Sequence, residues 1–124
     1  MTDLDIGPGQ MKVLRVLWKK KRVTAQEVTA LLNETEPIKF STVATFLRTL
    51  VKKGVAAYDV VDRTYFYYPV VPEEQVASHA VRGLIDHVFA GSVDGFVSFI
   101  MKNKELSSDE LETVRKLISE KDDK

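Results

Sequence analysis

The side chains of this sequence best suited to binding chemistry are hydroxyls and cations on one face of a segment running from Phe40 to Gly54. Apolar residues recur there at the i, i+3, i+4, i+7 spacing of a helix, which predicts one buried side. The opposite side presents Ser41, Thr42, Thr45, Arg48, Thr49 and Lys52, with Lys53 next along the chain. No acid occurs between Phe40 and Tyr58.

Hydroxyls and cations bind phosphates and base edges, whereas a carboxylate in the same place would repel phosphate. This face is therefore suited to lie against DNA. An ordinary solvated helix face is the alternative interpretation of the same residues.

Side chains for catalysis or metal binding are sparse. The chain has no Cys, and its two histidines, His79 and His87, lie roughly 80° apart around a predicted helix. It contains no Ser-His-Asp order, no glycine-rich phosphate loop and no HExxH motif. We therefore predict a protein that is not an enzyme, with no metal, no cofactor and no evident small-molecule ligand.

Composition and charge place this binding face in a wider context. The chain has 124 residues, of which 44% are hydrophobic and 29% charged, enough for one domain or two small lobes. It shows no signal peptide and no apolar run long enough to span a membrane, so we expect a soluble cytoplasmic protein. The net charge is zero, but residues 1–70 hold 11 Lys and Arg against 7 Asp and Glu, and residues 71–124 hold 7 against 11. This split favours a polyanion as the partner of the first half.

Three helices and a hairpin are predicted in the first half. A first helix covers residues 10–19, and the four basic residues 19–22 mark its end. A second starts at Thr24, where Thr24-Ala-Gln-Glu27 fits a capping box. In the third, residues 41–52, Ser41 is the expected N-cap, and Gly54 is the expected C′ residue beyond its end, in the left-handed conformation. Residues 55–60 and 65–70 are rich in β-branched and aromatic side chains and predict two strands.

The second half predicts three more helices. Pro72 suits the first turn of one, which carries an apolar stripe, and Ser92 begins the next. A capping box, Ser107-Ser-Asp-Glu110, begins the last. The stripe of the first of these helices is Val76, Ala80, Val81, Leu84, Val88 and Phe89.

These short helices hold more apolar side chains than they could bury alone, so we expect a symmetric dimer that covers them. The expected dimer contacts are Leu84, Val88, Phe89, Phe96, Ile100, Leu111, Val114, Leu117 and Ile118.

The predicted fold is mainly helical with a small β-hairpin: a winged helix-turn-helix domain over residues 1–71 and a three-helix dimerisation region over residues 72–124. Such a domain places one helix in the major groove, and a dimer presents two such helices to the half-sites of a palindromic operator. The expected partners are therefore double-stranded DNA and a second copy of the chain. A winged-helix module that binds protein without binding DNA is the alternative.

Six segments of the sequence, 11–19, 24–28, 42–45, 50–54, 63–67 and 106–111, match a known family in the same order. On these segments the sequence resembles the BlaI/MecI/CopY penicillinase repressor family, dimeric bacterial winged-helix repressors, nearly end to end. The resemblance implies that Thr42 and Thr45 contact operator DNA and that Arg63, Tyr65 and Tyr67 form the Arg-x-Tyr-x-Tyr pattern of the wing. It also implies that inverted repeats are bound to repress antibiotic-resistance or metal-homeostasis genes.

Two departures limit what the resemblance implies. The CopY-type metal site is rich in Cys, which this chain lacks, so copper sensing by that route is excluded. The Asn-Phe bond that is cut in β-lactam-responsive members aligns with Phe99-Ile100, so induction by that cleavage is not expected.

Overall fold

A computed structural model describes residues 2–103, 107–110, 112–113 and 116 of the chain. The chain divides into two compact units, Met1–Glu73 and Glu74–Lys124. Each unit is described by itself below.

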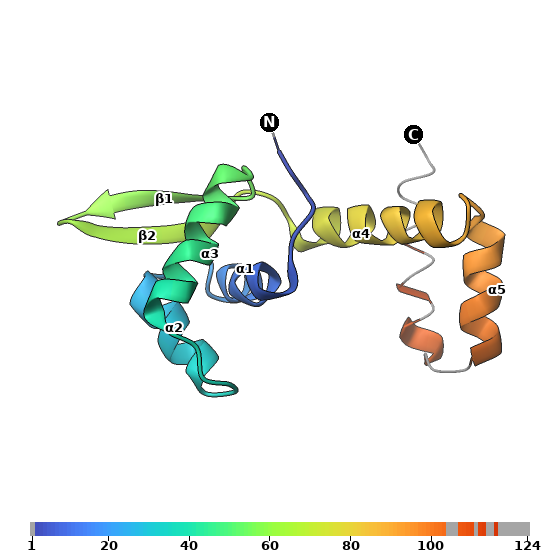
Figure 1. Cartoon of the computed structure of the whole chain (residues 1–124), viewed down its shortest axis with the longest axis horizontal. Helices are drawn as coiled ribbons and strands as arrows, with labels where there is room; N and C mark the ends of the chain where they lie inside the picture. The colour runs from blue at the N-terminus through green and yellow to red at the C-terminus, as the bar shows by residue number, and fades with distance from the viewer. Residues whose placement is uncertain (1, 104–106, 111, 114–115, 117–124) are drawn as a thin grey trace. The chain divides into compact units, whose positions relative to one another are not determined.

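The first unit contains three helices and a hairpin, with the elements labelled in Figure 1. The helices are α1 (Pro8–Lys20), α2 (Ala25–Asn33) and α3 (Phe40–Lys52). Each contributes the buried side of its apolar stripe to one core, because an amphipathic helix gains most by removing that stripe from water. The fully buried side chains of this core are Val13, Leu14, Leu17, Val28, Val43, Leu47, Leu50 and Val55.

The predicted capping box at the start of α2 is confirmed. The Glu27 backbone N–H donates to Thr24 Oγ1 at 3.1 Å, and the Thr24 backbone N–H donates to Glu27 Oε1 at 2.9 Å. At the other end of α2, the Asn33 side chain accepts from the N–H of Ile38 and donates to its C=O. These bonds fix the turn from α2 into α3.

The start of α3 differs from the prediction. The helix begins at Phe40, and its N-cap is Lys39, which makes no side-chain capping bond, so Ser41 is not the N-cap. Asn33 holds Ile38, which directs the chain into the helix at Lys39, and the N–H groups of Thr42 and Val43 both donate to the Lys39 carbonyl. Local geometry thus outweighs the capping preference of serine.

The predicted hairpin is confirmed, with strands β1 (Ala56–Val61) and β2 (Thr64–Pro69) paired antiparallel. Asp62 and Arg63 form its two-residue turn, both with positive φ (51° and 67°), which suits the right-handed twist of a tight hairpin. The segment between α1 and α2 joins the hairpin through Val23. Its N–H donates to the Tyr67 carbonyl at 3.0 Å, and the Tyr67 N–H donates back at 2.7 Å. Helices and hairpin together form the predicted winged helix-turn-helix.

In the second unit, α4 (Glu73–Val88) is followed by α5 (Val93–Asn103). Gly91, with φ of 83°, ends the turn after α4 by donating its N–H to the Ile85 carbonyl. Ser92 then caps α5 by accepting from the Gly95 N–H at 2.9 Å. Ile85 and Phe96 are buried between these helices, and Val81, Phe89, Val93 and Ile100 pack against them.

The apolar stripe predicted for α4 is only partly buried in the single chain. Ile85, which the prediction omitted, is fully buried, whereas Ala80, Leu84 and Val88 are exposed. The reason is that α5 packs on the side of α4 that carries Val81, Ile85 and Phe89.

The last predicted helix lies mostly outside the described residues. Its capping box is present, since the N–H groups of Ser107 and Glu110 bond reciprocally to each other's side chains. The expected dimer contacts Leu111, Val114, Leu117 and Ile118 lie outside the described residues. Within the described part of the chain, no one helix is long and apolar enough to cross a membrane. Glu73–Val88 and Val93–Lys102 reach that length and composition only together, and they are bent by 95° at their junction.

The contact between Gly9 and Phe46 gives a test of how tightly α1 packs on α3. A Cβ at Gly9 would lie 2.5 Å from the Phe46 ring, whereas a Cβ at Gly83 in α4 would meet nothing within 4 Å. We expect Gly9→Ala to lower the free energy of unfolding by about 1–3 kcal/mol through overpacking. Gly83→Ala, the matched control, should raise it by up to about 1 kcal/mol through helix propensity.

Both effects are measured by denaturant unfolding at one protein concentration. Combining Gly9→Ala with Phe46→Leu should recover part of the loss, because the shorter side chain vacates the space. A Gly9→Ala variant as stable as Gly83→Ala would contradict the close contact.

Candidate nucleic-acid interface

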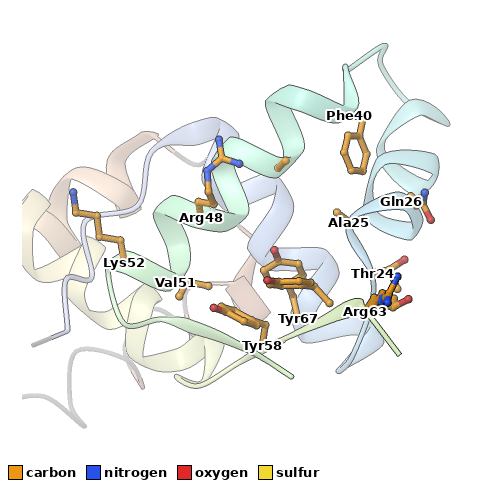
Figure 2. Close-up of a pocket in the computed structure, with 13 residues that line it drawn as sticks. Thr24, Ala25, Gln26, Phe40, Arg48, Val51, Lys52, Tyr58, Arg63 and Tyr67 are labelled. Atoms are coloured by element: carbon orange, nitrogen blue, oxygen red, sulfur yellow. The ribbon is translucent and has the colours of Figure 1, made fainter. Parts of the chain in front are cut away.

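A groove of about 770 Å³ lies between α3, the start of α2 and the hairpin. Figure 2 shows side chains from all three elements around it. It brings together five of the predicted binding residues, Arg48, Lys52, Arg63, Tyr65 and Tyr67. The other lining residues are Thr24, Ala25, Gln26, Phe40, Ala44, Val51, Tyr58 and Thr64, so the wall holds three cations and no acid.

The three groove cations are not neutralised by neighbouring carboxylates. Among the described residues, Arg48, Lys52 and Arg63 form no ion pair. Two other cations of the first unit are paired, since Lys12 lies 3.3 Å from Glu36 and Arg22 lies 3.5 Å from Asp59. The groove therefore presents positive charge that an anionic partner can neutralise.

Two threonines of α3, Thr45 and Thr49, use their hydroxyl protons within the helix. Thr45 Oγ1 donates to the Ser41 carbonyl at 3.0 Å, and Thr49 Oγ1 donates to the Thr45 carbonyl at 3.0 Å. Arg48 Nη2 in turn donates to Thr45 Oγ1 at 3.1 Å. Three side chains of the predicted polar face, Thr45, Arg48 and Thr49, are thus hydrogen-bonded to their own helix or to one another.

Three tyrosines of the hairpin form one wall of the groove. The ring centroids of Tyr58 and Tyr65 lie 4.8 Å apart, and those of Tyr58 and Tyr67 lie 5.7 Å apart. Burial raises the pKa of the Tyr67 phenol above its usual value, and Tyr58 and Tyr65 add to this, whereas the Arg48 charge acts in the opposite direction. Tyr67 therefore stays a neutral hydrogen-bonding group at neutral pH.

Tyr58 was missing from the predicted set. The antiparallel register places it directly opposite Tyr67, on the same face of the hairpin. Strand alternation could have identified it, because cross-strand neighbours share a face once the turn is fixed. Thr24 and Gln26 were missed as well, and only the folded chain brings the start of α2 to the groove.

Some predicted residues lie away from the groove wall. Lys53 Nζ donates to the Asp5 carbonyl and, at 2.9 Å, to Gln10 Oε1, so its charge is directed to the N-terminal segment. The other four, all on α3 but not lining the groove, are Ser41, Thr42, Thr45 and Thr49.

Metal binding finds no support in this geometry. In the part of the chain that the structure describes, no group of three or more His, Cys, Asp or Glu side chains could hold a metal ion. The arrangement of cations, hydroxyls and aromatic rings is suited to noncovalent recognition of an anionic polymer.

Comparison with known proteins agrees with this geometry. The model of the penicillinase repressor family matches residues 6–120. The penicillinase repressor of Staphylococcus aureus is 22% identical over 95% of this chain and 94% of its own length. The methicillin resistance regulatory protein MecI of S. aureus strain N315 is 23% identical over 94% of this chain and 95% of its own length.

Two solved structures share the fold of this chain. The DNA-binding domain of the repressor BlaI aligns with a TM-score of 0.54 and 28% identity, over 59% of this chain and 90% of that domain. A MarR mutant from E. coli, solved with operator DNA, aligns with a TM-score of 0.53 and 18% identity, over 94% of this chain and 76% of its own, and shows a shared fold. The family match covers most of the chain, and the chain therefore belongs to the penicillinase repressor family, whose members are DNA-binding transcriptional repressors and not enzymes.

Proposed function

We propose that this chain represses transcription as a homodimer that binds an inverted-repeat operator, with α3 of each copy in the major groove. The hairpin carrying Arg63 would lie beside the major groove of the DNA and contact the DNA backbone. In this arrangement the outer face of α3 supplies sequence specificity, and cations such as Lys52 and Arg63 supply affinity.

One observation carries the DNA part of the proposal. Every charged side chain lining the groove between α3 and the hairpin is a cation, and none of these cations has an ion-pair partner among the described residues. Neutralising phosphates with such cations releases counterions, which is the main source of affinity for duplex DNA. A neutral apolar groove would instead have favoured a protein partner.

The homodimer rests on apolar side chains that the second unit leaves in water. Leu84 and Val88, one turn apart on α4, are 43% and 66% exposed, and Phe99 and Met101 on α5 are 54% and 52% exposed. Phe96 belongs to the unit's own buried cluster, and Phe89 and Ile100 pack against it. A twofold-symmetric contact between copies would cover the exposed set and give two reading helices with matching symmetry.

The deciding experiment is selection of bound sequences from a random duplex library by the full chain. We expect an enriched site with two inverted half-sites. Enrichment of a single asymmetric half-site would remove the dimeric part of the proposal. No enrichment at all would favour the protein-binding alternative.

Lys52 gives a test of the phosphate contacts. We expect Lys52→Ala to weaken binding to selected and random duplexes by similar factors and to lower the salt slope of the binding constant by about one per half-site. Lys102→Ala, which removes an exposed lysine from α5, is the control and should change neither quantity. Fluorescence anisotropy across a salt series measures both. An unchanged salt slope in Lys52→Ala would contradict the phosphate contact.

Val88 gives a test of the dimer. We expect Val88→Asp to yield monomers, because a carboxylate at this exposed apolar position would be desolvated in the contact. Affinity for the palindromic site should then fall by roughly 10²–10⁴-fold, since the second half-site no longer binds at high effective concentration.

Sedimentation and binding assays measure these two effects. Gln75→Glu, which adds the same charge at an exposed polar position of α4, should remain dimeric. A dimeric Val88→Asp variant, or a monomeric unmodified chain, would contradict this assignment of the contact.

A further inference from the structure

A chain of hydrogen bonds on the outer face of α3 ends at the Arg48 guanidinium. Thr45 Oγ1 donates its proton to the Ser41 carbonyl at 3.0 Å and accepts from Arg48 Nη2 at 3.1 Å. All three residues are exposed, and Arg48 lines the groove beside the hairpin. The guanidinium is therefore already hydrogen-bonded to its own helix in the free protein.

The hydroxyl of Thr45 retains little capacity to read a base. A threonine hydroxyl has one proton to donate and two lone pairs. The proton and one lone pair are already used, which leaves a single acceptor position. Thr45 thus cannot donate to a base acceptor without breaking a bond within its own helix.

Arg48 retains most of its capacity. A guanidinium carries five N–H donors in a planar fork, and the bond to Thr45 uses one of them. A guanidinium has two edges that each carry a parallel pair of N–H groups. The bond to Thr45 occupies one Nη2 proton, which belongs to only one of these edges, so the other edge stays free. In the major groove, guanine presents two adjacent acceptors, O6 and N7, which match such a pair.

The bond to Thr45 also reduces the cost of recognition. An arginine side chain loses substantial rotamer freedom when it is fixed on a partner. Holding it at Thr45 in the free protein means that less freedom is lost on binding. The same bond favours one orientation of the guanidinium towards the DNA. A fixed orientation adds discrimination between bases.

We propose that Arg48 reads one guanine in each half-site through O6 and N7, and that Thr45 is the positioning residue that fixes its guanidinium. This inference rests on the proposed binding of duplex DNA. It assigns the hydroxyl of Thr45 an indirect role, in contrast to the direct operator contact that the family resemblance implies.

The test is sequence selection from a random duplex library with the full chain and its variants. Arg48→Ala should lower the preference for guanine at one position of each half-site by on the order of 5- to 150-fold. Thr45→Val, which keeps the shape of the side chain but removes the hydroxyl, should lower the preference at the same position. Thr45→Ser should retain it. The double variant, Thr45→Val with Arg48→Ala, should lose no more of the preference for guanine at that position than Arg48→Ala alone.

Thr29→Val is the matched control. Thr29 Oγ1 donates to the Ala25 carbonyl at 2.8 Å, the same i to i−4 bond as that of Thr45, but on α2 and without an arginine attached. This variant should leave the selected sequence unchanged. Thermal melting checks that each variant folds, and Thr45→Ala is a second variant without the hydroxyl should Thr45→Val fold poorly.

Three outcomes would overturn the inference. In the first, Thr45→Val alters the preference at a position that Arg48→Ala leaves intact, which would mean that Thr45 contacts its own base. Arg48→Ala could weaken all sequences equally, which would make Arg48 a phosphate contact. Failure of the unmodified chain to select any sequence would overturn the proposed function and this inference together, whereas the first two outcomes leave the proposed function standing.

Discussion

The groove depends on two backbone hydrogen bonds between Val23 and Tyr67, at 3.0 and 2.7 Å. Val23 is buried and directly precedes Thr24, the residue that caps α2. Tyr67 lies on β2, opposite Tyr58. The two bonds therefore hold the hairpin against the start of α2, while α3 packs on both α2 and β1. A two-stranded hairpin alone would be only marginally stable, so these bonds and its packing on α1 and α3 keep it in place.

Much of the first unit could be predicted because its signals are local. The capping box of α2 needs only Thr24 and Glu27, three residues apart, and the structure contains both bonds. The apolar stripe of α3 follows from helical spacing, and Val43, Leu47 and Leu50 are buried as expected. Tyr65 and Tyr67, two residues apart on β2, share one face of the hairpin by strand alternation, and their ring centroids lie 6.4 Å apart. In each case the deciding interactions lie within one element or between neighbouring elements.

Several features that escaped prediction depend on how separate elements pack against each other. Lys53 reads as a free cation after a helix, but its ammonium meets Gln10, which lies 43 positions earlier. On α4, the stripes through Leu84 and through Ile85 are adjacent, and the sequence alone does not say which one faces α5. The turn at Ala90 and Gly91 decides this, since the Gly91 N–H bonds to the Ile85 carbonyl and directs α5 to that side. Such choices are made by packing, which overrides local propensity.

A net charge of zero is compatible with binding a polyanion, because a phosphate interacts mainly with the charges close to it. Exposed charges are largely screened beyond about 8 Å at physiological ionic strength. The charge that acts on a bound phosphate is therefore that of the groove wall, which holds three cations and no acid. The net charge over all 124 residues has little effect on it. The ion pairs of Lys12 with Glu36 and of Arg22 with Asp59 act in the same direction, because they neutralise cations that do not line the groove. Pairing some cations and leaving others unpaired concentrates positive potential at the surface that presents Arg48.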